Sequence, residues 1–221
     1  MHWLWHDYGL MNPFNSPNYD PKPYEDILAY ASAAGFEFIT LSDYTKRFTS
    51  FKNSEVLVEY IDFDKIDVAV QGSELGGLSL ELPVGKTITS AGNHYAYDGN
   101  KLFLPADGGN FSITTGQSPE DVTKVASLGS NLELISISGN GTILDFVVEG
   151  HGQAIVEFKS FTLGAFEVIS SGDTTYTSTG AIINFKDIGN YAVQIRSTTN
   201  LVPYALDQDV TTLQGQPVTV Q

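Results

Sequence analysis

The chain has 221 residues, of which 42% are hydrophobic and 17% charged, so it is long enough for one large domain or two to three small ones with real cores. Its formal net charge of −15, with only 11 basic residues, argues against nucleic acid or an anionic membrane surface as a partner, because phosphate binding needs clustered Lys and Arg. It contains no cysteine, which excludes disulfides, thiolate zinc sites and a cysteine nucleophile.

In the first eight residues (MHWLWHDY), histidine and tryptophan side chains occur at alternating positions, and this period of two predicts a strand. The alternation places Leu4 and His6 on one face of the strand, and Trp3 and Trp5 on the other. A strand of this kind is an unusual start for an independent domain, so we expect it to be the last strand of a larger fold. Residues 9–21, rich in Pro and Asn, predict a long loop of the kind that covers a site.

A helix and a second strand are predicted next. The helix begins near Lys22 and ends at Gly35, the residue type that most often follows a helix C-terminus. Residues 36–41 are expected to form a short strand, and Ser42 is the expected N-cap of a helical turn that runs to Phe48. The order strand, loop, helix, strand is typical of an α/β fold with a parallel sheet or barrel.

From about residue 51 the sequence changes to short alternating runs separated by Gly, Pro, Asn and Asp, which predicts a mainly β region. We expect a first β-sandwich module at 51–118, with a hairpin turn at Asp98-Gly99-Asn100. Its strands are expected at 56–63, 66–70, 78–82, 94–97, 101–104 and 110–114.

A second β-sandwich module is predicted at 119–199, with tight turns at Asn140-Gly141 and Gly150-His151-Gly152. Its strands are expected at 133–137, 144–148, 154–158, 165–169, 181–185 and 191–195. Residues 200–221 read as a linker and the first strands of a further domain. These strands resemble the opening of the Ig-like or cadherin-like repeats of large bacterial surface proteins, so we expect a truncated repeat there.

Two motifs near the start carry a second resemblance. The Leu-x-His of Leu4-Trp5-His6, followed by the run from Ala31 to Leu41 (ASAAGFEFITL), is similar to the C-terminal end of the NodB-type polysaccharide deacetylases. The similarity covers about residues 1–48, which we therefore expect to be a βαβ remnant, at 1–50, of a (β/α) barrel. Proteins of this family remove acetyl groups from polysaccharides with the help of a metal ion.

The resemblance implies catalytic roles for two residues. Leu4 would line the pocket for the acetyl methyl group, and His6 would be the general acid that protonates the leaving group. An imidazole with a pKa near ~6.5 is suited to that task at neutral pH. The family's metal ligands lie upstream of this segment, so we expect no metal ligands and no cofactor in this chain. A divalent metal, zinc by preference, is implied for the parent enzyme, and we expect no activity without the missing upstream barrel.

Aromatic and acidic residues supply further candidates. Trp5, Tyr95 and Tyr97 are candidates for stacking on sugar rings, with burial in a core as the alternative. The acidic run Asp62, Asp64 and Asp67 resembles a calcium loop but lacks the glycine and the bidentate Glu that such a loop needs.

These observations favour a fragment of an exported polysaccharide deacetylase that is secreted or held at the cell surface. Its accessory β-sandwiches would either hold the enzyme on the polysaccharide or space it from the cell surface. No apolar run approaches the ~20 residues of a membrane-spanning helix, and we expect any export signal to lie on sequence ahead of Met1. The alternative is a non-catalytic surface or adhesion protein built from tandem β-sandwiches.

Overall fold

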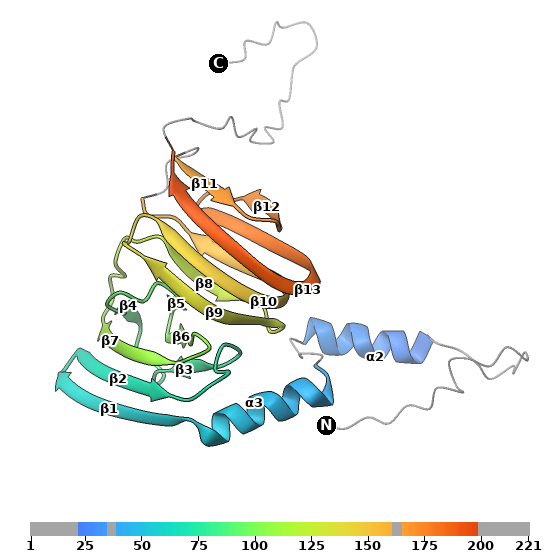
Figure 1. Cartoon of the computed structure of the whole chain (residues 1–221), viewed down its shortest axis with the longest axis horizontal. Coiled ribbons are helices and arrows are strands. Elements are labelled where there is room, and N and C mark those ends of the chain that lie inside the picture. The colour runs from blue at the N-terminus through green and yellow to red at the C-terminus, as the bar shows by residue number, and fades with distance from the viewer. Residues whose placement is uncertain (1–21, 35–38, 161–164, 199–221) are drawn as a thin grey trace, which may run out of the picture. The chain divides into compact units, whose positions relative to one another are not determined.

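The computed structural model describes residues 22–34, 39–160 and 165–198 (Figure 1). The chain divides into two compact units, Met1–Leu41 and Ser42–Gln221, which are described separately. In the first unit the described element is the helix α2 (Lys22–Ala33). The predicted start of this helix is therefore confirmed.

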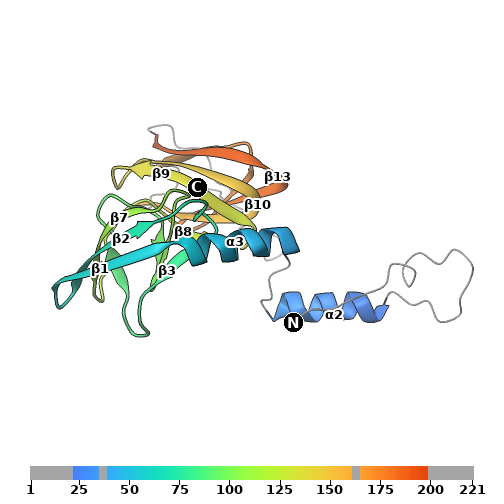
Figure 2. The ribbon, with the colours of Figure 1, turned by 60° about the horizontal axis from the view of Figure 1, so that its bottom comes forward.

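The predicted strand 36–41 is wrong at its three described residues, because residues 39 and 40 belong to no strand and Leu41 begins the helix α3 (Leu41–Asn53). Residues 36–38 lie outside the described residues. This helix is longer than the expected single turn, and Ser42 lies inside it rather than at its N-cap. The segment contains neither Gly nor Pro, and Asp43 in its first turn complements the helix dipole. Figure 2 shows α3 leading directly into the first strand of the second unit.

The second unit is mainly β, as predicted, and every ladder between its named strands is antiparallel. A four-stranded sheet has the order β1 (Glu55–Asp62), β2 (Lys65–Gln71), β7 (Gly109–Thr115), β4 (Ile88–Ser90). A three-stranded sheet has the order β3 (Ser79–Glu81), β6 (Lys101–Phe103), β5 (Tyr97–Asp98).

The largest sheet is built around two long strands that run side by side (Figure 1). Its order is β11 (Phe166–Ile169), β13 (Gly180–Ser197), β10 (Leu144–Glu157), β8 (Lys124–Leu128). Two further strands pair with the long ones: β12 (Asp173–Tyr176) with β13, and β9 (Leu132–Gly139) with β10. The strands β4, β8 and β12 were not expected from the sequence.

The expected tight turn at Gly150-His151-Gly152 is wrong, because these residues lie inside β10. The pairing register with β13 shifts between Gly150 and Gly152, so the two predicted strands on either side form one strand with an irregularity. Both glycines have positive φ, +115° and +132°, which explains why glycine stands there. A Cβ on Gly150 would lie 2.0 Å from the carbonyl oxygen of Asn131.

The other two predicted turns are confirmed. Asp98 pairs with Lys101 across a two-residue loop, and Gly99 has a φ of +55°. Between β9 and β10 the side-chain oxygen of Asn140 accepts hydrogen bonds of 3.0 Å from the backbone N–H groups of Thr142 and Ile143.

Two clusters of buried residues form the core of this unit. One cluster lines the four-stranded and three-stranded sheets and includes Val68, Val70, Leu102, Phe111 and Ile113. The other lines the largest sheet and includes Leu134, Phe146, Val156, Ile183 and Ile195.

Specific contacts join the regions 51–118 and 119–199 that were predicted as separate modules. A parallel bridge links Ala96 to Val125, both members of the second cluster, and the N–H of Leu134 donates a 2.8 Å hydrogen bond to the carbonyl of Gly76. Val122 packs against both clusters. Hydrogen bonding and packing therefore continue across the chain segment where one module was expected to end and the next to begin.

Candidate functional site

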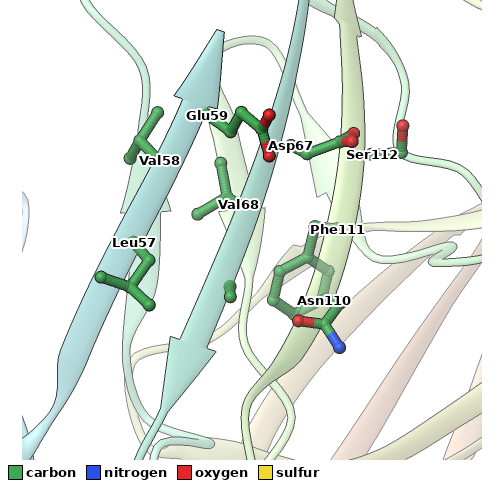
Figure 3. Close-up of a pocket in the computed structure, with 9 residues that line it drawn as sticks. Leu57, Val58, Glu59, Asp67, Val68, Asn110, Phe111 and Ser112 are labelled. Atoms are coloured by element: carbon green, nitrogen blue, oxygen red, sulfur yellow. The ribbon is translucent and has the colours of Figure 1, made fainter. Parts of the chain in front are cut away.

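A row of polar side chains crosses three neighbouring strands of the four-stranded sheet. The register pairs Glu59 of β1 with Asp67 of β2, and Asp67 with Ser112 of β7. Alternation along a strand places these side chains on the face opposite to Val68 and Phe111, which belong to the core. Figure 3 shows Glu59, Asp67 and Ser112 in line across the strands.

A second row lies two residues further along the same face. Leu57 pairs with Ala69, and Ala69 with Asn110. Together the two rows line an open groove of about 530 Å³ (Figure 3). The groove is lined by carboxylate, amide, hydroxyl and apolar groups, contributed by Leu57, Val58, Glu59, Asp67, Val68, Ala69, Asn110, Phe111 and Ser112.

The two carboxylates of the groove are held in an unfavourable arrangement. Glu59 and Asp67 are directly opposite across an antiparallel pair, a position in which like charges destabilise a sheet. The Oδ1 atom of Asp67 is buried and has no hydrogen-bond partner among the described residues, which adds a desolvation cost. A hydrogen-bond donor bound between the two carboxylates would relieve both costs.

The groups of this groove are suited to recognising a polyhydroxylated ligand. Carboxylate oxygens accept hydrogen bonds from hydroxyl groups, and the Asn110 amide and the Ser112 hydroxyl both donate and accept. Leu57 and Ala69 give apolar contacts beside them. No group of three or more His, Cys, Asp or Glu in described positions is placed to hold a metal ion.

The catalytic residues expected from the sequence, Leu4 and His6, lie outside the described residues, and so does Trp5. Their roles stay predictions.

The expected sugar-binding residues Tyr95 and Tyr97 are core residues, 8% and 1% exposed. The Tyr97 hydroxyl donates a 3.5 Å hydrogen bond to the carbonyl of Thr89, and burial raises its pKa to about 12. Neither ring offers a face to a sugar in this structure, because both are packed against other side chains. None of the residues that line the groove is a tyrosine.

The acidic residues Asp62 and Asp67, which the sequence analysis compared with a calcium loop, lie in different parts of the four-stranded sheet. Asp62 lies at the β1–β2 turn, where its carboxylate accepts a 2.7 Å hydrogen bond from the N–H of Phe63. Asp67 lies in the groove, beside Glu59. The sequence analysis missed Glu59; the signal that points to it is its place on the same alternating face as Leu57 in a predicted strand.

The described part of the chain thus defines a mainly β protein with an open groove that contains two carboxylates. Neither described helix is long and apolar enough to cross a membrane. Comparison of the chain with protein-family models, with curated proteins and with solved structures finds no match.

Proposed function

We propose that this chain is a fragment of an exported polysaccharide deacetylase, in which the mainly β region forms two β-sandwich modules that hold the enzyme on its glycan. The resemblance of residues 1–48 to the closing segment of a NodB-type barrel supports the enzymatic part of this proposal. The groove on β1, β2 and β7 supports the binding part, and it is the observation on which the proposal mainly depends.

In the parent enzyme the upstream barrel would hold a divalent metal that polarises the acetyl carbonyl and activates a water molecule. The contribution of this chain would be the imidazole of His6, which would give a proton to the departing amine or alkoxide. Leu4 would contact the acetyl methyl group. The metal ligands of the family lie upstream of the segment that resembles it, so we assign the metal to the missing barrel, and the chain alone has no deacetylase activity under this proposal.

Binding by the groove would be reversible and modest in strength. The groove is open, and a single sugar unit would meet only two rows of side chains, Glu59-Asp67-Ser112 and Leu57-Ala69-Asn110. Such contacts act by hydrogen bonds that largely replace bonds to water, so each contributes about 0.5–1.5 kcal/mol. Weak binding of this kind keeps an enzyme near an insoluble polymer without immobilising it.

Retention of the full chain on insoluble acetylated polysaccharides, such as chitin and acetylxylan, tests the binding part. The double variant Glu59→Gln with Asp67→Asn should be retained less, because hydrogen bonds from sugar hydroxyls to a carboxylate are stronger than those to a neutral amide oxygen. The matched control, Asp107→Asn with Asp187→Asn, removes the same charge from exposed residues outside the groove and should be retained like the wild type. Equal behaviour of the two double variants, or no retention of the wild type, would remove the glycan-binding role.

One observation favours the alternative, a non-catalytic surface or adhesion protein. Leu41 begins α3, so the last residue of the strand that should close the barrel is helical. Determining the coding sequence ahead of Met1 separates the two hypotheses. A barrel with an Asp-Asp pair and a His-x-x-x-His pair supports the deacetylase, whereas a series of further β-sandwiches supports the adhesion protein.

A further inference from the structure

The strand β1 is at the edge of its sheet and is paired, within the described part of the chain, with β2 alone. Its outer N–H and C=O groups are therefore free to pair with another strand. Proteins usually protect such an edge with charged side chains, most often Lys, or with Pro, a β-bulge or a short strand. β1 has eight residues and neither Lys nor Pro, and its one irregularity lies at its end, between Tyr60 and Asp62.

The apolar side chains of β1 are exposed on the face that continues the core. Val56 and Val58 pair with Val70 and Val68 of β2, which are buried, yet they are 46% and 48% exposed themselves. Tyr60, on the same face, is 82% exposed. The core therefore stops at β2. Figure 1 shows β1 at the edge of its sheet, where an added strand would extend the layer and place its own side chains beside the apolar residues of β1.

The charges of β1 decide what kind of strand fits. The strand carries Glu55, Glu59 and Asp62 and no basic residue. A second copy paired at this edge would bring the same three carboxylates into one small interface, where like charges repel. A segment with Lys or Arg at the facing positions would form favourable cross-strand pairs instead.

We propose that β1 receives an extended segment of another protein by strand addition, and that this segment alternates basic residues with apolar ones. The basic residues would face the acidic side chains of β1, and the apolar residues would face the exposed valines and Tyr60. This inference does not require glycan binding, although Glu59 also lines the groove. The basic residues of the segment would lie on the groove face of the sheet, and its apolar residues on the opposite face, beside Val56 and Val58.

A labelled peptide tests the proposal on the full chain by fluorescence anisotropy. The sequence Lys-Thr-Val-Lys-Val-Thr-Val-Lys, laid antiparallel to β1, places its lysines opposite the acidic residues. One control peptide replaces the central valine by proline, which keeps the charge but removes a backbone donor. The other replaces every lysine by glutamate. We expect both controls to bind about tenfold more weakly or worse.

Equal binding of the proline peptide would show general attraction to an acidic protein and would overturn the proposal, as would absence of binding by the first peptide. The variant Val58→Lys should weaken binding about tenfold by repelling the peptide. Val84→Lys makes the same charge change at a fully exposed residue outside β1 and should leave binding unchanged. Self-association of the chain that Val58→Lys abolishes, measured by sedimentation, would instead assign the edge to a second copy.

Discussion

Replacement of Lys124 by methionine tests how the largest sheet, which contains β8, is held to the three-stranded sheet, which contains β5 and β6. The Lys124 side chain is buried, with the residue 6% exposed, and its Nζ atom lies 3.1 Å from a Glu157 carboxylate oxygen and 3.4 Å from one of Asp98. The same atom donates a 3.2 Å hydrogen bond to the carbonyl of Tyr97 and lies 5.1 Å from the centre of that ring. One cation on β8 thus contacts both a strand of its own sheet and the β5–β6 hairpin.

The expected cost follows from what each contact loses. An unpartnered carbonyl at Tyr97 costs about 1–3 kcal/mol, and loss of the cation–π contact costs about 0.5–2 kcal/mol. Glu157 and Asp98 are about half exposed, so water replaces the lysine there and each ion pair contributes no more than about 1 kcal/mol. The methionine side chain offsets part of the loss by its own burial, which leaves a net destabilisation of about 2 kcal/mol.

Urea unfolding of Lys124→Met and wild-type protein measures this difference. The matched control is Lys186→Met, because Lys186 makes a shorter ion pair, 2.6 Å with Asp173, in which both side chains are about two-thirds exposed. We expect no measurable change in the control. A Lys124→Met variant as stable as the wild type, or a control that is equally destabilised, would refute the argument that burial rather than distance decides the contribution of a lysine here.

Further predictions concern the irregularity in β10, the groove and a buried histidine. Gly150→Ala should destabilise the protein by at least about 2 kcal/mol in the same urea assay, because φ is positive and the new Cβ would collide with the carbonyl of Asn131; a neutral result would show that the strand shifts freely there. Glu59→Gln with Asp67→Asn should raise the unfolding free energy by up to about 1 kcal/mol, since the like-charge pair is removed, and a decrease would contradict the electrostatic account of the groove. Burial lowers the pKa of His94, so its contribution to stability is present above the unfolded pKa of about 6.5 and is lost as the pH falls through the lower folded value. Unfolding measured from pH 8 to pH 4 should show this loss in the wild type and less of it in His94→Gln, and identical pH profiles would exclude His94 as its source.

Local patterns in the sequence were sufficient for the class of fold and for several elements. The short alternating runs predicted a mainly β region, and the start of α2 near Lys22 followed from helix rules. The turns at Asp98-Gly99-Asn100 and Asn140-Gly141 were also predicted. A turn spans about four residues, and Gly, Asn and Asp favour the backbone conformations that it requires, so the local sequence is sufficient to identify it. Composition by itself excluded cysteine chemistry.

Other features depended on contacts between residues far apart in the sequence. The sequence could show that Glu59 and Asp67 each lie on an alternating face, but only the register of β1, β2 and β7 brings them beside Ser112 in one groove. Gly150-His151-Gly152 resembles a turn locally, yet pairing with β13 on one side and β9 on the other keeps the chain extended through it. Alternation and turn propensity act over a few residues, whereas register, burial and the choice of neighbouring strand are settled by packing across the whole sheet.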